Sequence, residues 1–110
     1  MTAYAFAQLR KVDRNDEIRE YLRRIDDTLT PFGGTFLVHG AQPQVVDGDL
    51  PGTVVIIAFP DLQRAHAWYE SAAYQAILPF RTRNSDGGAA IVDGVPEGYR
   101  AAAYADKIGA

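Results

Sequence analysis

The sequence predicts an α+β fold whose elements follow the order strand, helix, strand, strand, helix, strand. The strongest evidence is the uncharged run at residues 53–59, which is mostly β-branched or aromatic and lies between Gly52 and Pro60. Its length and boundaries favour a strand over a helix. Both alternating sets of its side chains are apolar, so the sheet must be covered on both faces. The second observation is a long amphipathic helix pattern at residues 14–29.

The first strand is expected at residues 3–9. Tyr4 and Phe6 share one face with Gln8, while small alanines share the other face with Leu9. Because alanine is a poor strand former, this prediction rests on the alternation of the side chains. Small residues allow a close approach, so we expect another layer, such as a second sheet, to pack against the alanine face.

Asp13 is the expected N-cap of the helix at residues 14–29, and Asp16 and Glu17 favour its positive end. Pro31 ends the helix because it disfavours the α conformation of the preceding residue. The apolar stripe of this helix recurs at helical spacing and consists of Ile18, Tyr21, Leu22, Ile25, Leu29 and Phe32.

A second strand is expected at residues 35–39, where Gly40 allows a bend or bulge and the strand resumes at residues 44–46. Turn residues follow at 47–52 and lead into the strand at residues 53–59. The two strands are therefore expected to form an antiparallel hairpin.

Asp61 is the expected cap of the second helix, which pauses near Ser71 and then restarts. Pro79 is expected to kink the second piece or to open a fresh turn. Residues 84–88 are typical of a turn, and residues 89–92 are the expected last strand.

The expected domain covers residues 1–96, and an alanine-rich tail with Tyr99 and Tyr104 follows at residues 97–110. Two interpretations of the tail stay open. It is either a short helix or arm that docks on a partner, or a disordered segment.

This order of elements is the split βαβ, or ferredoxin-like, plan, with a four-stranded antiparallel sheet and its helices on one face. The other face would expose alternate side chains of residues 53–59 and one face of residues 3–9. Soluble monomers rarely expose an apolar patch of that size. We therefore expect a homodimer that pairs through the sheet faces and forms a dimeric α/β barrel.

The composition of the 110-residue chain, with 47% hydrophobic and 23% charged residues, is that of one globular domain. The net charge of −3 argues against a nucleic-acid partner. The absence of cysteine excludes disulfides and thiolate chemistry. Because no signal peptide or long apolar run occurs, we expect a cytoplasmic protein that makes no contact with a membrane.

The chain contains a series of short motifs: Gly33-Gly34, Asp47-Gly48, Pro51-Gly52, Phe59-Pro60, Ala67-Trp68-Tyr69-Glu70-Ser71, Tyr74-Gln75, Pro79-Phe80-Arg81, Ser85-Asp86 and Val92-Asp93-Gly94. In its order and spacing, this series resembles the family called domain of unknown function 1330 (DUF1330), whose members are dimeric α/β-barrel proteins. The resemblance covers residues 3–95 and leaves the tail out. It implies the ferredoxin-like fold, the dimer, and kinship in shape with small cofactor-independent monooxygenases, isomerases and stress-related barrels, but no settled activity.

Two departures from the family pattern bear on the ligand. Thr35 and His39 stand where basic residues, usually arginines, are expected in the family. Ala72-Ala73 replaces the pair with proline or an acidic residue that usually precedes the tyrosine at Tyr74. If these positions line a pocket, the resemblance implies a substrate that is less anionic than the ligands of related proteins.

Three residues are candidates for catalysis in a cavity between the sheet and the helices. His39 can act as a general base or acid near neutral pH, or it can be an ordinary histidine at a strand end. Arg81, which matches the family's arginine, can hold a carboxylate, phenolate or enolate oxygen, or it can form a structural salt bridge. Tyr69 can offer a hydroxyl to an oxyanion, or it can be a core aromatic residue.

Four residues are candidates for ligand binding. Tyr74 and Trp68 can wall the pocket, although Tyr74 can instead be a core residue and Trp68 can lie at the dimer contact. Ser85 and Asp86 can orient Arg81 or the ligand, or they can instead stabilise a turn. The chain has no glycine-rich phosphate loop, no metal-binding spacing and no serine elbow, so no cofactor or metal is expected.

We therefore predict a homodimeric barrel that binds a small apolar or aromatic metabolite and, if it is an enzyme, acts without a cofactor. The reaction would be proton transfer in an isomerase, cyclase or monooxygenase-like protein, with His39 moving the proton and Arg81 and a tyrosine hydroxyl holding the oxyanion. The alternatives are a non-catalytic ligand-binding protein and a module that only dimerises. A cavity on the order of several hundred Å³ favours an enzyme or a ligand-binding protein, and a packed interior favours the module that only dimerises.

Overall fold

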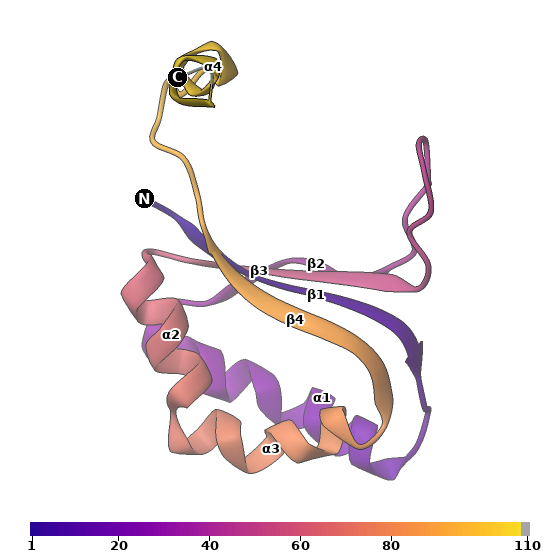
Figure 1. Cartoon of the computed structure of the whole chain (residues 1–110). Coiled ribbons are helices and arrows are strands. Elements are labelled where there is room, and N and C mark those ends of the chain that lie inside the picture. The colour runs from indigo at the N-terminus through magenta and orange to yellow at the C-terminus, as the bar shows by residue number, and fades with distance from the viewer. Residues whose placement is uncertain (109–110) are drawn as a thin grey trace.

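The computed structural model of the chain describes residues 1–108, in which an antiparallel sheet is covered by helices on one face (Figure 1). Across this range, the sheet has the strand order β2-β3-β1-β4. This arrangement confirms the expected ferredoxin-like βαββαβ plan. The strands are β1 (Ala3–Val12), β2 (Thr35–Ala41), β3 (Thr53–Phe59) and β4 (Ser85–Asp93). The helices are α1 (Asp16–Leu29), the short 3₁₀ helix η1 (Thr30–Phe32), α2 (Leu62–Glu70), α3 (Ala72–Thr82) and α4 (Ala101–Ile108).

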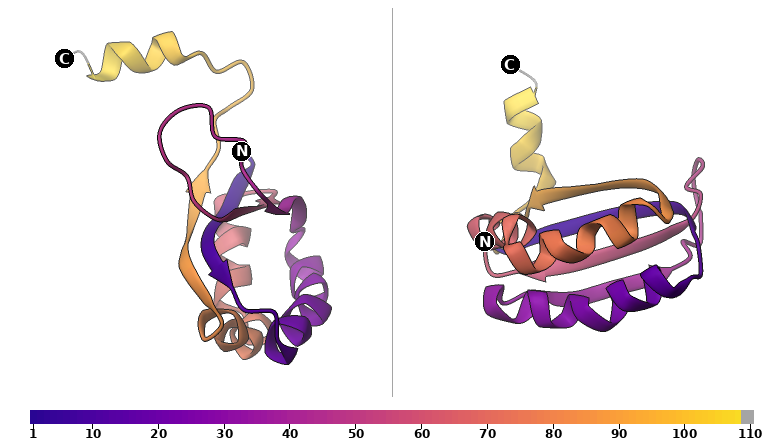
Figure 2. Two further views of the ribbon diagram at one scale, coloured as in Figure 1. Left: turned by 90° about the vertical axis from the view of Figure 1, so that its right-hand side faces the viewer. Right: turned by 90° about the horizontal axis from the view of Figure 1, so that it is seen from below.

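Helix α1 begins two residues later than the sequence suggested. Its N-cap is Asn15 and not Asp13, because the Asn15 side chain accepts a hydrogen bond from the Ile18 backbone N–H at 3.0 Å. The Asn15 side-chain amide also donates to Asn84 Oδ1 at 2.7 Å, which ties the start of α1 to the segment before β4. Asp13 instead donates its backbone N–H to the carbonyl oxygen of Asn84. Figure 2 shows that α1 and α3 run beneath the sheet, where they contact each other.

The hairpin of β2 and β3 forms as predicted, and the register shifts at Gly40, which has a φ of +74°. The expected resumption of the strand at residues 44–46 is wrong. Residues 42–52 form a loop that projects from the sheet, and Val46 is 97% exposed (Figure 1). Within residues 1–108, Val45 and Val46 have no neighbouring strand to pair with, so this part of the loop stays irregular.

The expected turn at residues 84–88 is wrong for most of its length, because β4 already begins at Ser85. Gly87 and Gly88 pair with Leu9 and Gln8 of β1. A Cβ atom on Gly87 would lie 2.1 Å from the Gln8 carbonyl oxygen, so this glycine permits a close approach of two strands where the sequence suggested a turn.

The second helical region divides as predicted. Ser71 ends α2 with an extended ψ of 146°, and its hydroxyl accepts a hydrogen bond from the Tyr74 backbone N–H at the start of α3. Asp61 caps α2 by accepting from the Arg64 N–H at 2.8 Å. Pro79 lies inside α3, which continues through it to Thr82.

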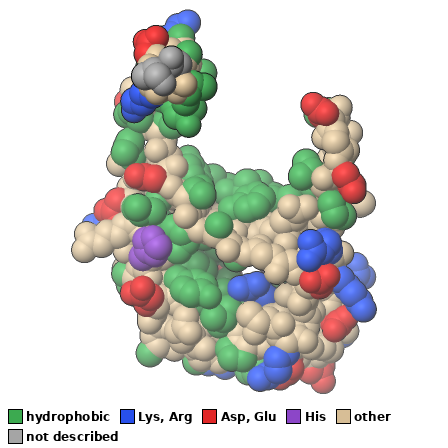
Figure 3. All heavy atoms as spheres, viewed as in Figure 1, with side chains coloured by type: hydrophobic (Ala, Val, Ile, Leu, Met, Phe, Trp, Pro, Cys, Tyr) green, Lys and Arg blue, Asp and Glu red, His purple; other side chains and the backbone are tan. Residues whose placement is uncertain are grey.

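The two faces of β1 have different environments. The alanines and Leu9 face the helices, in register with Val55 and Ile57 of β3, so the layer on the alanine face is helical and not a second sheet. The opposite face carries Tyr4, Phe6 and Ile56 and has no covering layer within residues 1–108. Figure 3 shows hydrophobic side chains gathered on that side of the sheet, between two projecting segments. We call it the open face.

The tail forms helix α4, which stands away from the sheet on the side of the open face (Figure 1). Its residues are exposed, including Tyr104 and Ile108 at 54% and 67%. Residues 109–110 of the expected tail lie outside the described residues. Within residues 1–108, no helix combines the length and the apolar character that crossing a bilayer requires.

Candidate functional site

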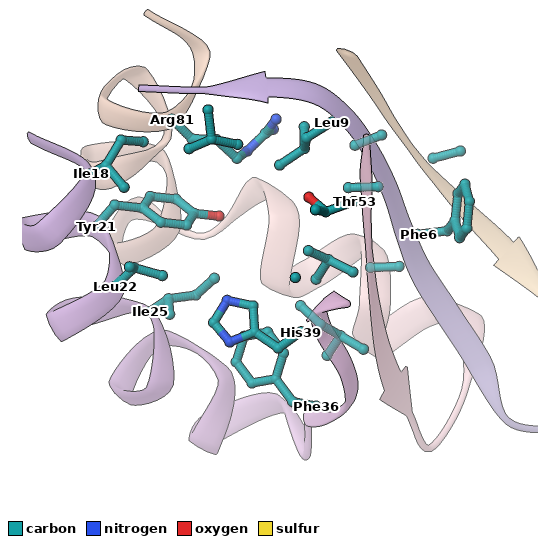
Figure 4. Close-up of a pocket in the computed structure, with 18 of the residues that line it drawn as sticks. Phe6, Leu9, Ile18, Tyr21, Leu22, Ile25, Phe36, His39, Thr53 and Arg81 are labelled. Carbon is teal, nitrogen blue, oxygen red and sulfur yellow. The ribbon is translucent and has the colours of Figure 1, made fainter. Parts of the chain in front are cut away.

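A cavity of about 820 Å³ lies between the helix-facing side of the sheet and the helices (Figure 4). The space exists because Ala5 and Ala7 of β1 and Ala89 of β4 present only methyl groups toward the helices. The rest of the wall is mainly apolar and comes from several elements. Its apolar contributors include Leu9, Ile18, Leu22, Ile25, Phe36, Val55, Ile57 and Ile91.

Two tyrosine hydroxyls form the polar centre of the cavity. Tyr21 of α1 and Tyr74 of α3 are both buried, and their hydroxyl oxygens lie 2.8 Å apart in a hydrogen bond. Their rings meet edge to face, with centroids 6.2 Å apart. Because each hydroxyl has one donor and two acceptor positions, the pair retains hydrogen-bonding capacity for a third group.

Arg81, in the last turn of α3, supplies a positive charge beside this pair (Figure 4). Burial lowers the pKa of Arg81, but its interactions with the hydroxyls of Tyr74 and Tyr21 outweigh burial, and the net direction is upward. The guanidinium is therefore charged at any physiological pH. Within residues 1–108, no carboxylate forms an ion pair with it.

The Tyr21 hydroxyl is held in its neutral form. Burial raises the pKa of Tyr21, the neighbouring Tyr74 raises it further, and Arg81 opposes the shift more weakly. At neutral pH this hydroxyl is therefore a hydrogen-bond donor as well as an acceptor. A ligand oxygen beside Arg81 would meet a cation and a phenol O–H together.

An aromatic wall stands next to the hydroxyl pair. The Trp68 and Tyr74 ring centroids lie 4.1 Å apart, and those of Tyr69 and Tyr74 lie 5.6 Å apart. Trp68 donates its indole N–H to the Thr28 hydroxyl at 3.0 Å, and that hydroxyl donates to the Ile25 carbonyl oxygen at 2.6 Å. With its one polar atom already bonded, Trp68 offers the cavity an apolar ring.

His39 lines the cavity from β2 and stacks on Phe36, with ring centroids 4.6 Å apart. Figure 4 shows its imidazole beside Ile25, while Arg81 enters the cavity from another side. A ligand between them would have a proton acceptor on one side and a cation with phenol donors on another. This arrangement suits the removal of a proton from a carbon next to a carbonyl group.

Of the residues predicted from the sequence, His39, Arg81, Tyr69, Tyr74 and Trp68 all line this cavity. The predicted ligand-binding residues Ser85 and Asp86 do not line it, and their functional role stays a prediction. The Ser85 hydroxyl donates to the Arg81 carbonyl oxygen at 2.7 Å, which helps to fix the end of α3. Asp86 pairs instead with exposed Arg10 at 3.2 Å.

Several residues at the cavity escaped the sequence prediction of the site, Tyr21 and His66 among them. Tyr21 belongs to the apolar stripe of α1. Its hydroxyl could have indicated a role at the site, because a buried phenol needs a polar partner. Its partner on α3 lies 53 residues away and could not be identified by local spacing. His66 of α2 is exposed and also borders the cavity. No cluster of three potential metal ligands occurs within residues 1–108.

Comparison with known proteins identifies the family and the fold. Residues 2–95 match the model of DUF1330, described as a domain of unknown function. No functionally curated protein matches the sequence.

Several solved structures share the fold at low sequence identity. A dimeric ferredoxin-like protein of unknown function from Jannaschia sp. is 16% identical, with a TM-score of 0.66 over 87% of this chain and 100% of that chain. A protein of unknown function from Rhodopseudomonas palustris is 12% identical, with a TM-score of 0.63 over 86% of this chain and 83% of that chain. A putative antibiotic biosynthesis monooxygenase from Nitrosomonas europaea is 17% identical, with a TM-score of 0.53 over 87% and 100% of the two chains.

Proposed function

The chain belongs to the DUF1330 family, and we propose that it binds a small, partly apolar or aromatic metabolite between its sheet and its helices. The observation that carries the proposal is the cavity of about 820 Å³, with apolar walls and a few converging polar groups. Ligand sites typically measure roughly 300–1,000 Å³ and combine these two features. A module that only dimerises has no need of such a space, and filling it would make the domain more stable.

We also propose that two copies pair through their open faces. The support is the apolar surface itself, in which Phe6 in the middle of β1 and Val92 near the end of the edge strand β4 remain 38% and 49% exposed. Solved structures with this fold are described as dimeric. Sedimentation equilibrium at micromolar concentration is expected to give twice the mass of one chain, and a monomer with an intact sheet would contradict the pairing.

A cofactor-independent enzyme is the second candidate, because His39 faces the cavity together with Arg81 and Tyr21. In the proposed reaction, His39 removes a proton from a carbon next to a carbonyl group. The electron pair of the C–H bond moves to the carbonyl oxygen, where Arg81 and the phenol O–H stabilise the enolate. Return of the proton at another carbon completes an isomerisation.

The binding proposal can be tested with the neutral fluorescent probe N-phenyl-1-naphthylamine. We expect saturable binding of the probe by the wild-type protein. Ala7→Phe is expected to lose most of this binding, because the new phenyl ring occupies space in the cavity. Ala76→Phe is the matched control, since Ala76 is exposed on α3 and does not line the cavity. Equal binding by both variants would place the probe elsewhere and would remove the support for a ligand site.

Catalysis can be tested by incubating the protein with a metabolite mixture and following the masses and retention times of its components. An isomerisation changes the retention time at constant mass, whereas oxygenation adds the mass of oxygen. His39→Gln is expected to abolish turnover while leaving probe binding within about twofold. If turnover persists in that variant, His39 does not move the proton.

A further inference from the structure

The charged residues that line the cavity have one sign. Within residues 1–108, its lining contains Arg10, Lys11, Arg14 and Arg81, but no aspartate and no glutamate. The whole chain has the opposite bias, with 14 acidic and 11 basic residues. The cavity is thus a positive region within a protein of negative net charge. Such a cleft attracts anions and repels cations, because low-dielectric walls concentrate the field.

The four cations have different positions. Arg10, Lys11 and Arg14 lie at the end of β1 and just before α1, and their side chains are exposed, so they form a basic rim. Arg10 pairs with Asp86, and Lys11 lies 3.8 Å from Asp13, but both pairs are open to water. Exposed pairs of this kind are weak, which leaves the rim able to attract a third charge.

Arg81 lies inside this rim, half-buried beside the hydroxyls of Tyr21 and Tyr74. Both of those groups are neutral dipoles, and no carboxylate of residues 1–108 pairs with the guanidinium. A charge withdrawn from water without a counter-ion is unfavourable, and an anion that enters the cavity relieves this cost. The guanidinium fork matches the two oxygens of a carboxylate.

We propose that the ligand of the cavity is an organic anion, with its carboxylate held by Arg81 and the Tyr21–Tyr74 hydroxyl pair. Its apolar body then lies along the wall formed by Leu9, Ile25 and Phe36. This inference rests on the proposed function, since it assigns a chemical class to the metabolite bound in the same cavity. It differs from the less anionic substrate that the family resemblance implied if Thr35 and His39 line the pocket. Of these two residues, only His39 lines the cavity.

The test compares two fluorescent probes that share one ring system, 9-anthracenecarboxylate and the neutral 9-anthracenemethanol. The wild-type protein is expected to bind the carboxylate about tenfold or more tightly than the alcohol at low salt. Arg81→Gln is expected to weaken carboxylate binding by about tenfold and alcohol binding by less than about twofold. Arg81→Lys keeps the charge but loses the fork, and an intermediate affinity is expected.

Arg24→Gln is the matched control, because Arg24 is exposed on α1 and does not line the cavity. It is expected to bind both probes like the wild-type protein. The double variant Lys11→Gln/Arg14→Gln is expected to reduce the salt dependence of carboxylate binding, since the rim acts through screened, long-range attraction.

The outcomes distinguish a failure of the anionic class from a failure of the proposed ligand site. If both probes bind with equal affinity, or if Arg81→Gln leaves carboxylate binding unchanged, the anionic class is wrong while the ligand site stands. If neither probe binds to the wild-type protein, the cavity is not a site for aromatic ligands of this size, and the proposed function fails together with the inference. Binding of the alcohol by Arg81→Gln confirms that this variant is folded.

Discussion

The hydrogen bond between Tyr21 and Tyr74 allows a quantitative test of the polar centre of the cavity. The two hydroxyl oxygens lie 2.8 Å apart, and both side chains are buried. Tyr74→Phe removes one partner without changing the ring, so the edge-to-face contact and the apolar packing stay in place. The Tyr21 hydroxyl would then have only Arg81 beside it.

The expected loss of stability depends on the hydrogen bond that is removed and on the contact with Arg81 that remains. Removing one partner of a buried hydrogen bond costs about 1–3 kcal/mol, because the remaining group is buried without its partner. Since Arg81 can replace part of the lost interaction, we expect a decrease of about 1–2 kcal/mol in the free energy of unfolding. The double variant Tyr21→Phe/Tyr74→Phe leaves no hydroxyl unpaired, so its loss should be smaller than the sum of the single losses.

Urea denaturation of the wild type, the two single variants and the double variant forms a double-mutant cycle. A coupling energy of about 1 kcal/mol is expected, with unchanged slopes of free energy against urea. Additive losses, with a coupling energy below about 0.3 kcal/mol, would mean that the two hydroxyls do not interact. The description of this pair as the polar centre of a binding site would then be wrong.

Three further predictions concern the backbone, the pH dependence and the assembly. Gly52→Ala is expected to destabilise the protein severely in thermal unfolding, because Gly52 has a φ of +89° and a Cβ atom there would lie 2.1 Å from the Leu9 carbonyl oxygen. Gly48 has a φ of +74° with open space around it, so the control Gly48→Ala should lower the free energy of unfolding by only about 1 kcal/mol. Because burial raises the pKa of Tyr21, the unfolded chain releases this proton first, so stability falls as the pH rises above about 10, and Tyr21→Phe should flatten that alkaline slope in urea titrations. Ile56→Lys, which places a charge on the open face away from the cavity, is expected to convert the proposed dimer into a monomer in sedimentation equilibrium, and a persistent dimer would locate the interface elsewhere.

The elements that the sequence predicted well are those whose signals are local and unopposed. The strand at residues 53–59 appears with the predicted bounds because apolar β-branched residues and flanking Gly52 and Pro60 favour the same structure. Ser71 is similar, since one hydroxyl marks the break between α2 and α3 and caps the second helix.

The errors arose where a residue type suits two different roles. Asp13 and Asn15 are both good caps, and the tertiary hydrogen bond from Asn15 to Asn84 favours the second. Gly87 and Gly88 are typical of turns, but they also permit close strand pairing, and only the register with β1 distinguishes the two roles. These choices depend on contacts between residues far apart in the sequence.

The candidate site likewise has parts that local sequence signals predict and parts that depend on contacts between distant residues. Chemical type, together with the family resemblance for Arg81, selected His39, Arg81, Tyr69, Tyr74 and Trp68, all of which line the cavity. The tyrosine pair and the uniform charge of the lining depend on how α1, α3 and the end of β1 meet in space. No local pattern in a single sequence encodes that arrangement.

The alternation along β1 connects the cavity with the open face. Tyr4 and Phe6 have their rings on the open face, and Figure 4 shows the Phe6 ring pointing away from the cavity, whereas Ala5 and Ala7 face the helices and leave the space that becomes the cavity. A shift of β1 by one residue against β3 would exchange the two sets, because side chains alternate with a period of two. The aromatic rings would then enter the cavity and fill it, and β1 would contribute mainly methyl groups to the open face in place of two aromatic rings. One register of one strand therefore determines both the surface proposed for dimerisation and the space proposed for the ligand.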